Sequence, residues 1–127
     1  MKLSAERTKK IEVPGDPDKG FVVIRMLSLE ETSQIEGKHM IISEKGISIN
    51  NYSERDSAYA IACIKDWGNL FDVDNTPIKF NAINMNKVAN FAIIIDGETV
   101  RFFEWVKREL TKFTEEVEEQ EKAAIKN

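Results

Sequence analysis

The chain has 127 residues, of which 42 % are hydrophobic and 9 % aromatic, so it is long enough for one modest core and too apolar to be disordered throughout. Its formal net charge of −4 argues against a nucleic-acid backbone as the main partner, because phosphate contacts need clustered Lys and Arg. No apolar run approaches the roughly 18 residues of a membrane-spanning helix, and the segment MKLSAERTKK lacks the apolar centre of a secretory signal. We therefore expect a single domain over residues 1–127, in the cytoplasm and without a membrane partner.

The first part of the chain, residues 11–50, is predicted to be mainly β, after a polar segment over residues 1–10 that we expect to be flexible. The run at 10–13 alternates in polarity, and the run at 21–27 is rich in β-branched residues. Between them lies Pro-Gly-Asp-Pro at 14–17, a strong turn signal. These features predict a β-hairpin with a long loop.

A capping-box pattern follows this hairpin. Ser28 precedes Glu31 by three residues, the spacing at which the two side chains can each bond the other's backbone amide. The pattern predicts a short helix from Leu29 to about Glu36, ended by Gly37.

Two short apolar runs come next, at 40–43 and 46–49, with Glu44-Lys45 between them. Their β-branched composition favours a second hairpin. The alternative is one longer helix through residues 29–43, and the sequence leaves both open.

Residues 53–117 are predicted to be mainly helical. A first helix is expected from Ser53 up to Trp67-Gly68, and a second from a cap at Asn84 through Ile95, stopped by Asp96-Gly97. A third is expected to begin at Glu98 or Thr99. The predicted fold class is α+β, with N-terminal hairpins that form a small antiparallel sheet and a C-terminal part of about three helices.

The last predicted helix has the most regular pattern in the chain, and residues 118–127 beyond it are expected to be flexible. Its apolar residues recur at spacings of three and four, which places them on one face. The pattern allows two interpretations: the stripe is the core face of the helix, or it is a surface that binds a partner. The stripe consists of Phe103, Val106, Leu110, Phe113 and Val117.

The stretch KDWGNLFDVDNTPIKF, residues 65–80, contains two alternating aspartates that could suggest a calcium loop. If Asp72 took the first position of such a loop, Pro77 would stand where the sharp turn needs glycine, and Ile83 where a bidentate Glu is required. The better interpretation is a solvated loop in which short polar side chains bond local amides.

The remaining reactive residues give no catalytic, cofactor or metal site. His39 is the only histidine, so a catalytic triad or a histidine metal site is not expected. Cys63, the only cysteine, lies in an apolar helical stretch typical of a buried structural thiol. Because the glycines form no phosphate-binding loop either, we expect a protein that is not an enzyme.

Three segments resemble the tail assembly chaperones of long-tailed bacteriophages and prophages. The first is VPGDP at 13–17 followed by FVVIRMLS at 21–28. The second is IKDW at 64–67, followed by DVDN at 72–75 and TPIKF at 76–80. The third is FFEWV at 102–106. They occur in order and span most of the chain.

The resemblance implies a non-catalytic chaperone that binds the long, helix-rich tape measure protein, with the tail tube protein as a second possible partner and self-association as a further property. Such proteins act in the host cytoplasm and are absent from the mature virion. With this implied function, the five stripe residues become the expected partner-binding positions. Two alternatives are a virion structural component, such as a tail or head–tail joining protein with exposed hairpins, and a generic bacterial adaptor.

Overall fold

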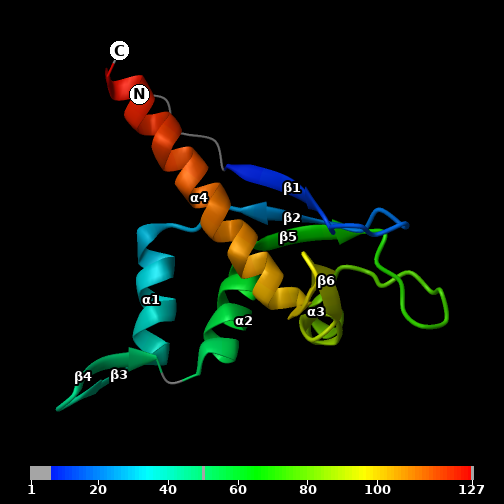
Figure 1. Ribbon diagram of the computed structural model, residues 1–127, viewed down its shortest axis with the longest axis horizontal. Helices are drawn as coiled ribbons and strands as arrows, with labels where there is room; N and C mark the ends of the chain where they lie inside the picture. Colours follow the sequence, from blue (N-terminus) through cyan, green and yellow to red (C-terminus); the bar gives the residue numbers. More distant parts are fainter. Residues whose placement is uncertain (1–6, 50, 127) are drawn as a thin grey trace.

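The computed structural model describes residues 7–49 and 51–126. The fold class is α+β, as predicted, with N-terminal antiparallel strands and four helices. The elements, shown in Figure 1, are β1 (Thr8–Glu12), β2 (Phe21–Arg25), α1 (Leu29–His39), β3 (Met40–Ser43), β4 (Gly46–Ile49), α2 (Tyr52–Cys63), β5 (Ile64–Gly68), α3 (Ala82–Ala89), β6 (Ala92–Ile95), β7 (Glu98–Arg101) and α4 (Phe102–Lys126).

The main sheet has the strand order β1-β2-β5 and is antiparallel throughout. The predicted first hairpin is confirmed, since β1 pairs with β2. The third strand corrects the sequence analysis, which continued a helix to Trp67-Gly68: α2 ends at Cys63, and residues 64–68 pair with β2 instead. Both Ile64 and Trp67 are buried by this pairing, so tertiary contacts override the helical pattern of the sequence.

The second hairpin is confirmed, and the alternative of one helix through residues 29–43 is wrong. The capping box at Ser28 and Glu31 forms as predicted, and α1 runs to His39. Met40 then takes extended backbone angles, φ −97° and ψ 135°, and starts β3. In Figure 1 the β3–β4 hairpin projects from the end of α1.

The region from 82 to 101 differs most from the predicted helices. The cap of α3 is Asn81, whose side chain accepts from the amide of Asn84, and the helix ends at Ala89 instead of continuing to Ile95. A hairpin of β6 and β7 occupies residues 92–101, where the sequence predicted the end of one helix and the start of the next. Both residues of its turn, Asp96 and Gly97, have positive φ (50° and 80°), the geometry of a type I′ turn.

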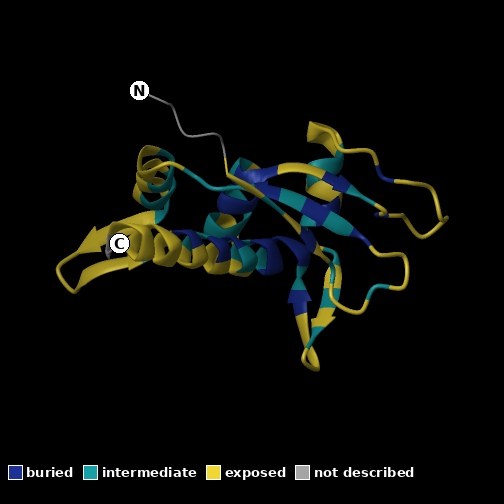
Figure 2. Ribbon diagram, turned by 90° about the horizontal axis from the view of Figure 1, so that it is seen from above, coloured by how far each residue is buried: buried dark blue, intermediate teal, exposed yellow. Residues whose placement is uncertain are grey.

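Helix α4 starts at Phe102 and crosses the molecule, packing against α2 (Figure 1). One core joins the buried side of the main sheet, the inner faces of α2 and α4, and Val88 of α3. Beyond Val117, residues 118–125 of α4 are exposed in a helix that continues to Lys126, as Figure 2 shows by its colour.

Candidate protein-binding groove

The five stripe residues of α4 belong to the core. Phe103, Val106, Leu110, Phe113 and Val117 are between 0 and 7 % exposed. Of the two interpretations that the sequence allowed, the structure supports the core face. In the folded chain these side chains stabilise the domain.

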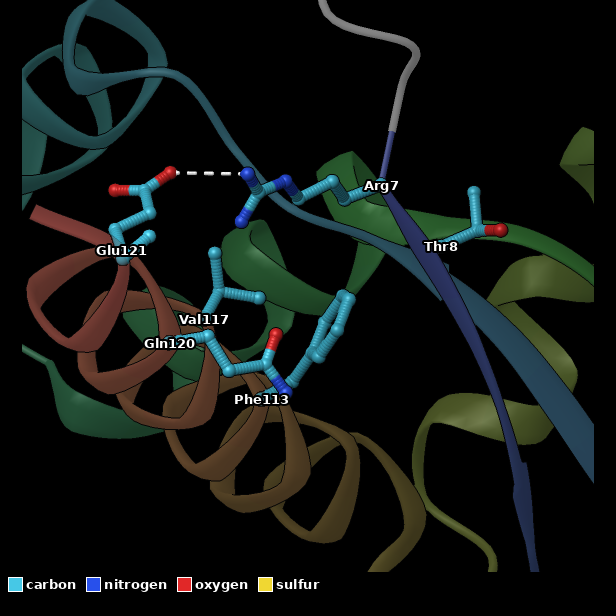
Figure 3. Close-up of a pocket in the computed structure, with 7 residues that line it drawn as sticks. Arg7, Thr8, Phe113, Val117, Gln120 and Glu121 are labelled. Carbon is cyan, nitrogen blue, oxygen red and sulfur yellow. Dashed lines mark ion pairs between the residues drawn. The ribbon is translucent and has the colours of Figure 1, made fainter. Parts of the chain in front are cut away.

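Two of the stripe residues nevertheless line a small pocket at the outer half of α4 (Figure 3). Phe113 and Val117 form its floor, and its volume is about 370 Å³. An ion pair of 3.1 Å between Arg7 and Glu121 spans its opening from β1's N-terminal side to α4. The pocket is therefore part of the contact between β1 and α4, which Lys9 reinforces with a 2.9 Å ion pair to Glu116.

A larger groove of about 920 Å³ lies at the other side of the molecule, where two loops face β6 and the end of α3. Its lining comes from the β1–β2 loop, from the segment that follows β5, and from the region 87–102. The lining residues are Val13, Pro14, Gly15, Asp16, Asp18, Asn69, Leu70, Phe71, Asp72, Val73, Ile78, Lys87, Phe91, Ala92, Ile93, Ile94 and Phe102. Most of the lining is apolar.

The first loop is held by Asp16. Its carboxylate accepts from the amide of Gly20 at 2.8 Å and from the amide of Asp18 at 3.1 Å. A Cβ at position 20 would lie only 2.6 Å from that carboxylate, so a larger residue there would displace the Asp16 side chain. Asp16 thus stabilises the loop with its own backbone and is not free to act on a ligand.

The second loop, residues 69–80, is held in two places. The Asp72 carboxylate accepts from the amides of Asp74 (2.9 Å) and Thr76 (3.0 Å), which confirms the solvated loop expected from this stretch. The Trp67 indole N–H donates to the carbonyl of Ile78 at 2.7 Å in a buried position, and Phe80 packs edge-on to its ring with centroids 4.9 Å apart. These contacts fix the base of a loop whose tip carries apolar side chains.

Exposed apolar side chains stand on both walls of the groove. Val73 at the loop tip is 99 % exposed and Ile94 of β6 is 69 % exposed. The β6–β7 register pairs Ile93 with Val100 and Ile95 with Glu98. Because the tight turn makes Ile95 and Glu98 a hydrogen-bonded pair, the backbone groups of Ala92 and Ile94 point away from β7, toward the open edge. The groove therefore offers both apolar contacts and one unpaired strand edge.

A second cluster of polar groups joins α1 to α2. Tyr59 donates to the carboxylate of Glu36, and Arg55 lies 3.9 Å from Glu36 and 3.7 Å from Asp56. Burial, followed by the bond to Glu36, raises the pKa of Tyr59, and burial raises the pKa of Asp56. Shifted pKa values can mark an active site, but this cluster borders neither hollow, so its contacts serve to fasten the two helices.

The other residues weighed for chemistry lie in structural positions. Cys63 is fully buried, and burial raises the pKa of its thiol to about 12, as expected of a structural thiol. His39 is half-buried at the last residue of α1. Within residues 7–49 and 51–126, no three side chains of His, Cys, Asp or Glu are grouped so that they could hold a metal ion.

The sequence analysis missed the groove, although the signals for its parts were present. The Asp-Gly pair at 96–97 follows the apolar run at 91–95 and is a strong hairpin signal, but the same pair is also typical of the end of a helix. Without the β6–β7 hairpin, no wall faces the loop after β5, and the groove cannot be inferred.

Comparison with known proteins finds no matching family model, no matching curated protein and no matching solved structure. None of the helices in the described part of the chain has both the length and the apolar composition that crossing a bilayer requires.

Proposed function

We propose that this protein is a non-catalytic chaperone of bacteriophage tail assembly that binds an apolar helical segment of the tape measure protein in the groove between β6 and the loops after β1 and β5. The observation that carries the proposal is the groove itself, with its apolar walls and aspartate-rich rim. In this proposal the protein acts in the host cytoplasm and leaves before the virion is complete.

The size of the groove suits a helix. Two turns of a helix with side chains form a cylinder about 10–12 Å across and about 11 Å long, which occupies roughly 850–1,200 Å³. The groove volume of about 920 Å³ is in this range. Helices bind such grooves through apolar residues at spacings of three and four.

The polar groups of the groove favour a protein segment over a small molecule. Specific small-molecule sites place a few free polar groups toward the ligand, but the carboxylates of Asp16 and Asp72 are already bonded to amides of their own loops. Asp18 and these two acids lie on the lining with Lys87 as the one cation, which gives the lining an excess of negative charge. We therefore expect the bound helix to carry Lys or Arg beside its apolar face.

The test is co-expression with the long helical protein expected downstream, followed by size-exclusion chromatography and an affinity measurement. Ile94→Glu places a charge on the apolar wall, and we expect affinity to fall at least about tenfold, because a carboxylate buried without a partner costs roughly 1–3 kcal/mol or more. The matched control is Leu29→Glu, at the first residue of α1 and outside the groove lining, with 88 % exposure against 69 % for Ile94. Both positions are exposed, so both variants should fold.

Equal affinity of the two variants and the wild-type chain would refute the groove as the binding site. Failure of the wild-type chain to bind the helical protein at all would refute the chaperone proposal. One observation favours a second candidate, a virion structural component: the β3–β4 hairpin is exposed on both strands (Figure 2). Assembly of the chain alone into rings would support this candidate instead.

A further inference from the structure

The β3–β4 hairpin carries an apolar face whose outer half nothing in the described chain covers, while Met40 (37 % exposed) and the half-buried Ile49 at its base are partly covered. The register pairs Met40 with Ile49 and Ile42 with Ile47, so these four side chains lie on the same side of the hairpin. Ile42 is 79 % and Ile47 is 68 % exposed. The opposite side has Ile41 and otherwise only Ser and Gly.

This hairpin is not supported by the core. Of the partly buried apolar side chains that pack against the core, none belongs to residues 40–49. A two-stranded hairpin alone is at best marginally stable in water. A contact that covers the apolar face would therefore stabilise the hairpin.

The strands also lack the charges that protect the outer edge of the main sheet. The outer strand of the main sheet, β1, carries Lys9, Lys10 and Glu12, and charges of this kind discourage further pairing. Neither β3 (MIIS) nor β4 (GISI) contains a charge or a proline. The only charges are Glu44 and Lys45 at the turn, which have opposite sign.

We propose that the apolar face of Met40, Ile42, Ile47 and Ile49 is a self-association site, covered by the same face of a second copy of this chain. A two-fold pair places identical patches against each other, so the patch must be compatible with itself. An uncharged face with one acid and one base at its tip meets this condition, because two copies approach without net repulsion. The rest of the chain carries the net charge of −4, so two copies approaching through other surfaces would on average repel each other.

The size of the face determines the strength of the pair. Four aliphatic side chains each offer less than the roughly 150–250 Å² of a large aromatic residue. The face therefore stays below the roughly 800 Å² per partner of a standard stable interface. A pair of this size is expected to be weak and to be populated only at high protein concentration.

Sedimentation velocity of the purified chain between about 5 µM and 1 mM tests the inference without any partner. The wild-type mass should rise from monomer toward dimer across this range, and Ile42→Glu should remain a monomer. Ile94→Glu, in β6 and outside the hairpin, is the matched control and should still pair. A monomer at every concentration, growth beyond the dimer, or pairing that survives Ile42→Glu would overturn the proposal.

A second measurement remains informative if Ile42→Glu alters the hairpin. Single cysteines at Ile42→Cys and Ile47→Cys should be joined into covalent dimers by a short bismaleimide, since the faces meet. Wild type should stay unlinked because Cys63 is buried, and Ile94→Cys should stay unlinked because it is outside the interface. Dimers at Ile94→Cys in equal yield would show non-specific contact and overturn the inference. The readout needs only this chain, so failure here is distinct from failure of the chaperone proposal.

Discussion

The two tryptophans form a matched pair for testing what holds the groove loop in place. Trp67 is 5 % and Trp105 is 1 % exposed, so a change to Phe removes a similar buried volume from each. They differ in hydrogen bonding. The indole N–H of Trp67 donates to Ile78, whereas that of Trp105 is buried with no acceptor among the described residues.

Trp67→Phe leaves the Ile78 carbonyl without its donor, and stranding a buried polar group costs about 1–3 kcal/mol. Trp105→Phe has the opposite effect, because it removes a donor whose burial already carries a penalty of that order. We therefore expect the free energy of unfolding to fall more in Trp67→Phe than in Trp105→Phe, by about 2–6 kcal/mol. The shared loss of packing cancels in this difference.

Urea unfolding followed by far-UV circular dichroism measures both variants on the same scale. With an m-value of about 1–3 kcal/mol/M, the two midpoints should be separated by about 0.7 M or more. Trp67→Phe should also speed hydrogen exchange of the Ile78 amide, which donates to Leu70 at 2.8 Å at the base of the same loop. Midpoints that agree to within about 0.5 kcal/mol of stability would refute the role assigned to the Trp67 bond.

Three further predictions concern single positions. Arg25 binds Glu31 through both carboxylate oxygens and lowers the pKa of that carboxyl from 4.5 to about 2. The resulting stabilisation is present above pH 4.5 and is lost as the pH falls toward 2. Glu31→Gln should therefore reduce the change in unfolding free energy across this pH window by up to about 1 kcal/mol, as acid unfolding will show. Leu110→Ala should cost about 2–5 kcal/mol in denaturant titrations, because the side chain is core, and a near-neutral result would contradict that burial. Gly97→Ala should cost about 1–2 kcal/mol, because its φ of 80° disfavours a Cβ, and thermal unfolding will detect it unless the turn changes type.

Local signals in the sequence predicted much of the N-terminal half. The capping box at Ser28 and the turn at 14–17 are decided by residues a few positions apart, and the structure has both features where they were expected. The stripe on α4 gave the helix and its spacing correctly. It could not say which surface covers the stripe, because an apolar face has the same pattern whether it packs in its own core or on a partner.

The errors occurred where distant pairing decides the structure. Residues 64–68 continue an apolar helical pattern, but β2 needs a third strand, and pairing with it buries Trp67. Residues 92–95 fall inside the helix expected between a cap at Asn84 and a stop at Asp96-Gly97, but pairing with β7 makes them a strand. The groove depends on both of these pairings, so single-sequence periodicity could not predict it.

The β3–β4 hairpin lies at one end of the long axis of the molecule, and the β1–β2 loop and the loop after β5, which line the groove, lie toward the other end (Figure 1). A pair joined through its hairpins would therefore keep both grooves facing outward and unobstructed, and would be divalent. A long partner with several suitable helical segments could engage both grooves at once, and the second contact would then form at a high effective concentration. Such linkage can raise overall avidity by about 10²–10⁴ without any new contact. Two grooves that each bind weakly, joined by a weak pair of hairpins, would together hold an extended partner firmly. The partner would be released once packing around it displaced one of the two grooves or separated the pair.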